Sequence, residues 1–325
     1  MAPDLLILTE AGGTAGYGHL MRCSAIADAW GSAKILVNEL GRFPSRDKLI
    51  THLWLNNPRS IFGFINDRTV LLVDSYRADY DVYEEIKSLG NKLVVIDDYD
   101  RICYPCDLLV NPGILSPSYK ECIADILSGP EYIIIRREVK SVSPKEYINN
   151  EINDVFIMLG GADHSKLLTV ILDVLVKYHF NINIIIGNDE RAEALSLQYN
   201  IDSLKLYGRL DASRVAELMC ESDLAISAGG QALNELSYLG VPTIAIQTGI
   251  DQEFNMKGFV QQGFLPGYLR SNDADIVPGL ENLIMKYSSH EKRSMASNLG
   301  KKLVDGNGVV RIVEAIQSRL GLINN

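Results

Sequence analysis

Short apolar runs that alternate with longer amphipathic segments constrain the fold of this chain more than any other feature. The first half contains five strand-sized runs rich in β-branched residues, and these are residues 5–9, 34–38, 69–74, 93–97 and 107–111. Helical patterns lie between some of them, over residues 19–30 and 80–90 for example, and the glycine that ends the second is a common C-terminal stop. A repeated order of strand, helix and strand predicts a parallel sheet with helices on both faces.

A second series of the same kind occupies the second half of the chain. Its strand-like runs are residues 154–161, 182–188, 204–209, 224–230 and 242–248. Residues 140–152, between the two series, are polar and lack clear periodicity, which is typical of a linker. Because 325 residues exceed one ordinary core, we expect two α/β domains, over residues 1–145 and 152–325. A last helix from about residue 309 fits either domain.

The position of a ligand follows from this architecture. In open parallel sheets, ligands bind beyond the carboxyl ends of the strands. Two such sheets joined by a linker are therefore expected to face each other across a cleft that holds the ligand.

Charge and hydropathy exclude several classes of partner. The formal net charge is -10 and the isoelectric point is near 5.1, whereas proteins that bind polyanions display excess Lys and Arg on one face. We therefore expect no nucleic-acid partner, and any phosphate to be bound by backbone amides and helix ends. The longest apolar runs are strand-sized, too short for a membrane span, and the N-terminus lacks the pattern of a secretion signal.

Cysteine usage indicates a reducing compartment. Five cysteines, an odd number, fit a cytoplasmic location. Cys103 and Cys106 have the spacing of a redox or zinc pair. A zinc site needs a second Cys/His pair, and a thioredoxin-like motif starts a helix after a strand, whereas this pair precedes the strand-like run 107–111. Two ordinary thiols are the favoured interpretation.

Three strand ends continue into a glycine-containing loop and then into a helical pattern. These loops are TEAGGTAGYGH (9–19), MLGGADHSKLL (158–168) and ISAGGQALNEL (226–236). Glycines let the backbone approach a ligand closely, and a helix N-terminus presents unpaired N–H groups to an anion. Neither the P-loop pattern nor the G-x-G-x-x-G order of a dinucleotide site is present. Two such loops in the second half predict that a phosphate binds there.

Charged residues near the strand ends of the first half are candidates for chemistry. His19 either satisfies a backbone carbonyl at a helix start or acts as a general base or acid that the glycine loop exposes. Arg22 lies one turn later on the same helical face, where it can hold a phosphate or orient a substrate. Asp74, Asp97 and Asp98 end two strands, so each can orient an imidazole, bind sugar hydroxyls or cap the following helix. Adjacent carboxylates point apart, so at most one of Asp97 and Asp98 is expected to meet the ligand.

Two residues of the second half have a simpler interpretation. Glu235 lies on the helix that follows Gly229 and Gly230, where its carboxylate can accept both hydroxyls of a ribose while the helix start binds phosphates. His164 is expected only to cap a helix start.

Several of these segments, taken together and in order, resemble one family. GYGHLMRCSAIA (16–27) and DLAISAGGQALNELSYLGVPTIAIQTGIDQ (223–252) are similar to segments of the nucleotide-sugar hydrolases of the pseudaminic-acid pathway and of their spore-coat polysaccharide relatives. The resemblance extends through LLVDSYRADYDVYEEI (71–86), LVVIDDYDR (93–101), CDLLVNPG (106–113), GPEYIIIRREV (129–139) and MLGGADHSK (158–166). It implies a GT-B fold, with two Rossmann-like domains around a UDP-sugar.

The resemblance also implies roles for individual residues. His19 matches the catalytic histidine, which is expected to activate the attacking water. The second domain is expected to bind UDP through residues Gly160, Gly161, Gly208, Arg209, Leu210, Ser227, Gly229, Gly230, Gln231, Asn234 and Glu235. On the substrate side, we expect contacts from Gly16, Tyr17, Gly18, Arg22, Asp74, Tyr76 and Asp98. Helix N-termini and amides stabilise the leaving UDP, so neither a metal nor another cofactor is expected.

One departure from the family concerns the sugar. Members often carry an Arg-x-Asp pattern on the strand before the histidine loop, where this chain has Glu10 and small residues. We therefore expect hydrolysis of a UDP-linked amino or deoxy sugar to free sugar and UDP, with inversion at the anomeric carbon, and leave the sugar open. The alternatives are a GT-B glycosyltransferase that moves the sugar to an acceptor, and a catalytically silent nucleotide-sugar sensor.

Overall fold

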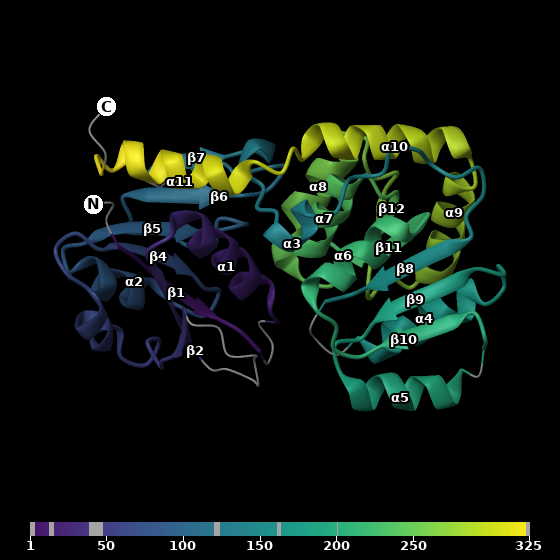
Figure 1. Cartoon of the computed structure of the whole chain (residues 1–325), viewed down its shortest axis with the longest axis horizontal. Coiled ribbons are helices and arrows are strands. Elements are labelled where there is room, and N and C mark those ends of the chain that lie inside the picture. Colours follow the sequence, from purple (N-terminus) through teal and green to yellow (C-terminus); the bar gives the residue numbers. More distant parts are fainter. Residues whose placement is uncertain are drawn as a thin grey trace. The chain divides into compact units, whose positions relative to one another are not determined.

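The computed structural model describes residues 4–12, 16–38, 48–119, 124–160, 164–199 and 201–322 (Figure 1). The chain forms two compact units. The first comprises Met1–Arg136 with Gly306–Asn325, and the second comprises Arg137–Asp305. In the described part of the chain, no helix combines the length and the apolar character needed to cross a membrane.

The first unit is built on a seven-stranded parallel sheet with the strand order β3-β2-β1-β4-β5-β6-β7. Its strands are β1 (Leu5–Glu10), β2 (Ala33–Asn38), β3 (Leu49–Thr51), β4 (Val70–Asp74), β5 (Lys92–Ile96), β6 (Leu108–Asn111) and β7 (Asp125–Ser128). The five runs predicted from the sequence are all strands. The short edge strands β3 and β7 were not predicted, because β3 has three residues and β7 has two apolar residues between polar ones, so neither forms a strand-sized apolar run.

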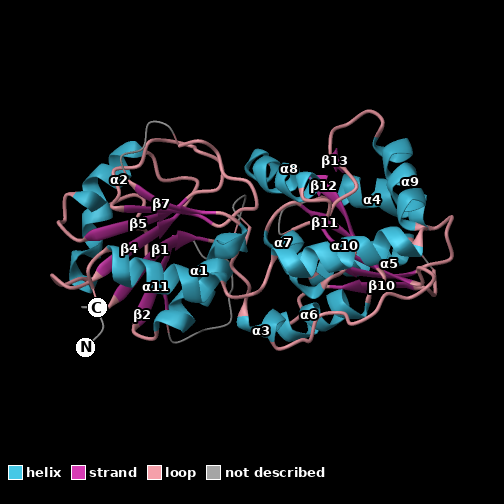
Figure 2. Ribbon diagram, turned by 90° about the horizontal axis from the view of Figure 1, so that it is seen from above, coloured by secondary structure: helices cyan, strands magenta, loops and turns pink. Residues whose placement is uncertain are grey.

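Alternate residues of these strands fill two separate cores. One core holds Ile7, Leu72 and Val94 beneath α1 (Gly18–Trp30) and α11 (Gly308–Arg319). The other holds Leu8 and Val73 beneath α2 (Tyr80–Lys87) and η1 (Pro58–Phe64). Figure 2 shows the helices of this unit on both sides of its sheet, as the continuous apolar strand runs predicted.

The C-terminal helix α11 corrects the expected domain boundaries. We expected the second domain to extend to residue 325, but residues 306–325 belong to the first unit. The reason is apolar burial: Ile312 and Ile316 of α11 are fully buried in the same core as Leu20 and Cys23 of α1. Figure 1 shows α11, in yellow, beside elements from the purple and blue end of the chain.

The second unit contains a six-stranded parallel sheet with the order β10-β9-β8-β11-β12-β13. Its strands are β8 (Asp154–Met158), β9 (Asn181–Ile185), β10 (Leu204–Tyr207), β11 (Leu224–Ala228), β12 (Thr243–Gln247) and β13 (Tyr268–Arg270). Its helices are α3 (Arg137–Lys140), α4 (Ser165–Leu175), α5 (Asp189–Gln198), α6 (Ala212–Glu221), α7 (Gln231–Leu239), η3 (Ile250–Gln252), α8 (Glu253–Gln261), α9 (Ile276–Tyr287) and α10 (His290–Leu303). The five predicted strands are present, and the three-residue β13 is additional.

The segment expected to be a linker, residues 140–152, is instead part of the second unit. Lys145 donates from Nζ to the carbonyl oxygen of Cys220 at 2.7 Å, and Asn149 donates from Nδ2 to Asp223 Oδ1 at 2.7 Å. The buried guanidinium of Arg293 donates to the carbonyl oxygens of Asn149 and Asn150. These polar contacts hold a segment without apolar periodicity, so composition alone did not reveal that it is packed.

Candidate functional site

The charged residues singled out in the first unit meet at the carboxyl ends of three neighbouring strands. Asp74 is the last residue of β4, and Asp98 follows β5. His19 and Arg22 lie in the first turns of α1, which begins at Gly18 after the glycine loop. In that loop Gly12 N donates to Gly16 O at 2.8 Å, and Gly16 has a φ of 66°, a value that glycine adopts without strain. Tyr17 is the N-cap residue and makes no side-chain cap bond.

His19 and Asp74 form a buried hydrogen-bonded pair. His19 Nδ1 lies 2.7 Å from Asp74 Oδ1, and the two side chains are 6% and 0% exposed. An ionised carboxylate only accepts hydrogen bonds, so Nδ1 of a neutral ring carries the proton and Nε2 holds the lone pair. Among the described residues, the polar contacts of the ring, with Asp74 and Arg22, both involve Nδ1. The ring therefore presents a basic nitrogen for proton transfer.

Arg22 joins two carboxylates. Its Nε donates to Asp74 Oδ2 and its Nη2 to Asp74 Oδ1, both at 2.6 Å. Its Nη1 donates to the two oxygens of Asp98 at 2.9 and 2.8 Å. Burial by itself lowers the pKa of the guanidinium, but Asp74 and Asp98 outweigh it and hold that pKa well above its usual range. In this structure Arg22 is engaged by carboxylates rather than presented to a phosphate.

Asp74 is held in its ionised form. Burial by itself raises the pKa of its carboxyl group, but the neighbouring Arg22 and His19 outweigh burial and hold that pKa well below its usual value. The interpretation of Asp74 as a helix cap is wrong, because Asp79 caps α2 by accepting from Val82 N at 3.1 Å. Sequence reasoning missed Cys23, whose buried Sγ lies 3.4 Å from Asp74 Oδ2, since a cysteine on an apolar helix face gives no such signal.

The adjacent carboxylates Asp97 and Asp98 point apart, as expected. Asp97 is buried and accepts from the hydroxyls of Tyr104 at 2.6 Å and Tyr119 at 2.7 Å. Asp98 turns toward Arg22 and the hydroxyl of Tyr76. Asp97 therefore stabilises the loop after β5, and Asp98 belongs to the cluster around His19.

Tyr76 connects this cluster to β1. Its ring contacts the His19 ring edge to face, with centroids 4.3 Å apart. Its backbone N–H donates to Glu10 Oε1 at 2.8 Å. Glu10, which stands where the resembled family often has an Arg-x-Asp pattern, is 1% exposed. Its buried carboxylate therefore holds the backbone of Tyr76 in place.

The second unit gathers its candidate residues where β11 meets α7. Gln252 Oε1 accepts from Gly229 N at 3.1 Å, and Asn255 Nδ2 donates to Gly229 O at 3.1 Å and to Asn234 Oδ1 at 3.0 Å. A Cβ at Gly229 would lie 2.4 Å from Met256 Sδ, so a larger residue requires Met256 or the loop to shift. Gln252 and Asn255 were not predicted, because neither belongs to a glycine loop.

Two predicted nucleotide contacts are buried side chains. Ser227 is fully buried, and its hydroxyl donates to Ala228 O at 2.9 Å. Glu235 is 1% exposed, and its Oε1 lies 3.4 Å from Gln231 Nε2. Gly230 is the N-cap of α7 and offers no side-chain cap, and the first turn of α7 holds no acidic residue. The start of α7 is therefore electrostatically suited to an anion.

The other glycine loops of this unit lie at the same edge of the sheet. Gly160 follows β8 with a φ of 93°, whereas Gly161 lies outside the described residues. A cavity of about 20 Å³ is lined by Gly160, His164, Arg191 and apolar residues. His164 occupies the N-cap position of α4 without a side-chain cap bond.

The loop after β10 contains the three residues Gly208, Arg209 and Leu210. Arg209 N donates to Asp189 Oδ1 at 3.1 Å. A Cβ at Gly208 would lie 1.7 Å from that same oxygen. Asp189 therefore fixes this loop, and does so only because residue 208 has no side chain.

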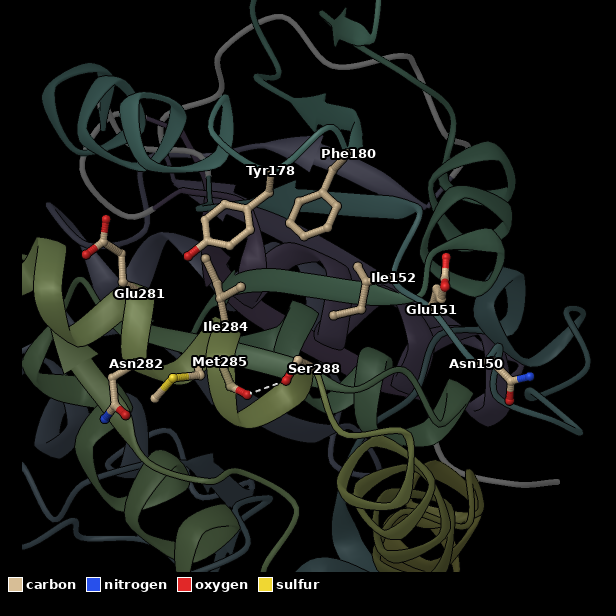
Figure 3. A pocket seen from close by; sticks show the side chains of 10 residues that line it. All are labelled: Asn150, Glu151, Ile152, Tyr178, Phe180, Glu281, Asn282, Ile284, Met285 and Ser288. Carbon is tan, nitrogen blue, oxygen red and sulfur yellow. Dashed lines mark hydrogen bonds between the residues drawn. The ribbon is translucent and has the colours of Figure 1, made fainter.

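A larger cavity, of about 640 Å³, lies at the opposite end of the same sheet (Figure 3). Its lining residues precede β8 and β9, belong to α9 or, in the case of Ser288, directly follow α9. Figure 3 shows Tyr178 and Phe180 next to each other above Ile284. No candidate residue of the sequence analysis lines it. Cys103 and Cys106 are thiols in the segment before β6, and the described residues contain no cluster of His, Cys, Asp or Glu arranged to hold a metal ion.

Comparison with known proteins gives one family match. Residues 155–307 match the model of the glycosyltransferase family 28 C-terminal domain. This range contains every predicted UDP contact of the second unit.

Three curated proteins are similar in sequence. The chain is 26% identical to the uncharacterized protein MJ1062 of Methanocaldococcus jannaschii, over 74% of this chain and 55% of the relative. It is 24% identical to the spore coat polysaccharide biosynthesis protein SpsG of Bacillus subtilis, over 96% of this chain and 97% of the relative. It is also 24% identical to the pseudaminic acid cytidylyltransferase and UDP-2,4-diacetamido-2,4,6-trideoxy-beta-L-altropyranose hydrolase of Helicobacter pylori, over 79% of this chain and 47% of the relative. The chain thus spans about half the length of two of these relatives and nearly all of SpsG.

Solved structures share the fold. MnaA of S. aureus, in a co-structure with UDP, aligns with a TM-score of 0.70 at 12% identity, over 98% of each chain. MurG of Acinetobacter baumannii aligns with a TM-score of 0.66 at 14% identity, over 97% of this chain and all of its own. CalG4, the calicheamicin glycosyltransferase, aligns with a TM-score of 0.61 at 10% identity, over 100% of both chains. The two parallel-sheet Rossmann-like units and these neighbours show that the chain has the GT-B fold. Its sequence is related to a glycosyltransferase domain family and to proteins of polysaccharide biosynthesis and sugar-nucleotide hydrolysis.

Proposed function

We propose that this protein hydrolyses a UDP-linked amino or deoxy sugar to the free sugar and UDP. The observation that carries the proposal is the hydrogen bond of 2.7 Å between His19 Nδ1 and buried Asp74, because it leaves Nε2 as a base. The similarity to the Helicobacter pylori hydrolase supports it, as does the UDP-bound fold neighbour MnaA.

In the proposed reaction, His19 Nε2 takes a proton from water as the water oxygen bonds to the anomeric carbon of the sugar. The bond from that carbon to the UDP oxygen breaks, and both of its electrons leave with UDP. Attack opposite the leaving group inverts the anomeric centre. Asp74 holds the ring tautomer and stabilises the imidazolium that forms.

The second unit supplies the UDP site in this proposal. Backbone N–H groups at the start of α7 and of the loop after β8 bind the diphosphate, and they stabilise the charge that develops on it. Glu235 accepts the ribose hydroxyls, and the loop Gly208–Leu210 contacts the base through its backbone. This set uses no metal and no further cofactor.

A second candidate is transfer of the sugar to an acceptor hydroxyl. The match to the family 28 C-terminal domain and the likeness to CalG4 favour transfer as much as the similarity to the Helicobacter pylori protein favours hydrolysis. A base that activates water also activates a hydroxyl group, so His19 and Asp74 fit both reactions. The acceptor therefore decides between them.

The test is to incubate the protein with a set of UDP-sugars without an acceptor and to measure released UDP and free sugar. We expect release by the wild type and by His179→Asn, a control in an exposed turn. His19→Asn should abolish release and keep UDP affinity. Release that requires an added acceptor would favour the transferase, and binding without turnover under both conditions would favour a sensor.

A further inference from the structure

The charges around His19 form an alternating chain. Asp74, Arg22 and Asp98 carry formal charges of one negative, one positive and one negative unit, linked by hydrogen bonds of 2.6 to 2.9 Å. Arg22 Nη2 lies 3.3 Å from His19 Nδ1, so a cation stands almost as close to the ring as Asp74 does. A cation at that distance opposes protonation of an imidazole.

Asp98 balances this cation from the other side. Both of its oxygens bind the same nitrogen, Nη1 of Arg22, and its side chain is 19% exposed against 0% for Asp74. With Asp98 ionised, protonation of His19 takes the cluster from one net negative charge to neutrality. Without that charge, the same step would take a neutral cluster to one net positive charge in a largely buried place, which costs free energy.

We propose that Asp98 is a positioning residue for His19, which acts through Arg22 and sets the pH range over which His19 takes up a proton. The role in catalysis rests on the proposed function, whereas the effect on His19 itself does not. Asp98 then contributes charge rather than a contact to the sugar.

The other charged or titratable groups around His19 come from every neighbouring element of the site. Arg22 and Cys23 lie on α1 itself, Asp74 ends β4, and Tyr76 follows it. Glu10, at the end of β1, holds Tyr76 N, and Tyr99 contacts the ring of Tyr76 edge to face at 5.3 Å. α11 packs against α1 through the apolar Val309, Ile312, Val313 and Ile316. Of these groups, Asp98 is the one whose removal takes away a negative charge that balances Arg22 without breaking the pair His19–Asp74.

The first experiment follows the titration of His19 by NMR in the protein without substrate. The chain has five histidines, and the signal of His19 is assigned by its loss in His19→Asn. In Asp98→Asn, we expect the titration midpoint of His19 to fall by about one pH unit, because one nearby negative charge is lost. Asp98→Glu keeps the charge and should return the midpoint toward that of the wild type.

Two further variants separate charge from contact. Asp67→Asn removes one exposed carboxylate outside the cluster and should leave the midpoint in place. Tyr76→Phe removes the hydroxyl that contacts Asp98 but no charge, so its shift should be much smaller than that of Asp98→Asn. An unchanged midpoint in folded Asp98→Asn, or an equal shift in Tyr76→Phe, would overturn the proposal.

The second experiment measures UDP release against pH. In Asp98→Asn, the acidic limb of kcat/KM should move to lower pH by the same amount as the NMR midpoint, and kcat at the plateau should fall because the base is weaker. A rise in KM with an unmoved pH profile would identify Asp98 as a sugar contact and overturn the proposal. If wild-type protein releases no UDP from any UDP-sugar, the proposed function fails, and the NMR titration still decides the role of Asp98.

Discussion

The candidate residues of the two units are held by different kinds of interaction. In the first unit, charged side chains meet: His19, Arg22, Asp74 and Asp98 are joined by short hydrogen bonds and ion pairs. In the second unit, glycine backbone is held by neutral amides, as Gln252 and Asn255 hold Gly229. A charged cluster is suited to moving a proton, because its members stabilise an imidazolium. Fixed N–H groups at a helix start are suited to an anion that does not react with them.

The largest expected effect comes from Asp74→Asn in the first unit. The amide still fills the space, but it no longer favours the tautomer with a proton on Nδ1, and it leaves Arg22 with one carboxylate. We expect turnover of a UDP-sugar to fall on the order of 10³-fold while UDP affinity changes less than twofold. Steady-state kinetics and calorimetric titration with UDP measure the two quantities, with exposed Asp67→Asn as the control.

An equal loss of turnover and UDP affinity in Asp74→Asn would contradict the different roles of the two units. It would mean that the charged cluster shapes the nucleotide site instead of acting on a proton.

The next largest effect is expected from Gly229→Ala in the second unit. The added Cβ would lie 2.4 Å from Met256 Sδ and 3.0 Å from Gln252 Cβ, so either these side chains or the loop must shift, at a cost of about 1–3 kcal/mol in the free energy of unfolding. Gly230→Ala is the matched control, because a Cβ there meets nothing within 4 Å. Urea unfolding measures the difference, and equal stability of the two variants would show that Met256 and Gln252 do not pack tightly against Gly229.

Glu235→Ala tests the role of the second unit in UDP binding. In the proposed function this buried carboxylate accepts the ribose hydroxyls, so its loss is expected to weaken UDP binding roughly tenfold or more, since hydrogen bonds to charged groups contribute about 1.5–3 kcal/mol. kcat at saturating substrate should change less than KM. Exposed Glu314→Ala serves as the control, and a kcat loss larger than the KM rise would place Glu235 in the chemical step.

The smallest effect concerns stability in acid. Because the pKa of folded Asp74 lies well below its usual 3.8, its ionisation stabilises the fold above pH 4, and this contribution is lost as the pH falls below that value. The difference in free energy of unfolding between wild type and Asp74→Asn should shrink by about 1 kcal/mol between pH 4 and pH 3. Urea unfolding at each pH measures it, and a difference that is constant with pH would mean that Asp74 is not held ionised.

Much of the fold and part of the site were predictable from local pattern. The ten predicted strands follow from apolar runs, because burial in a parallel sheet favours uninterrupted apolar residues. The short strands β3, β7 and β13 were not predictable, since they form by pairing with a neighbour. Likewise, the packing position of α11 depends on which apolar surface the other helices leave exposed. The sequence of α11 does not indicate that this surface lies beside α1.

The same physical reason explains which features of the site could be predicted and which could not. The sequence alone determined which residue types stand at the strand ends and that His19 and Arg22 share one helical face, because strand and helix periods are local. Three features became visible in the folded chain alone: Asp74 and Asp98 both bind Arg22, Asp97 turns away to two tyrosines, and Gln252 and Asn255 hold Gly229. Those contacts join residues far apart in the chain, and their choice depends on sheet order and side-chain direction, which no local period encodes.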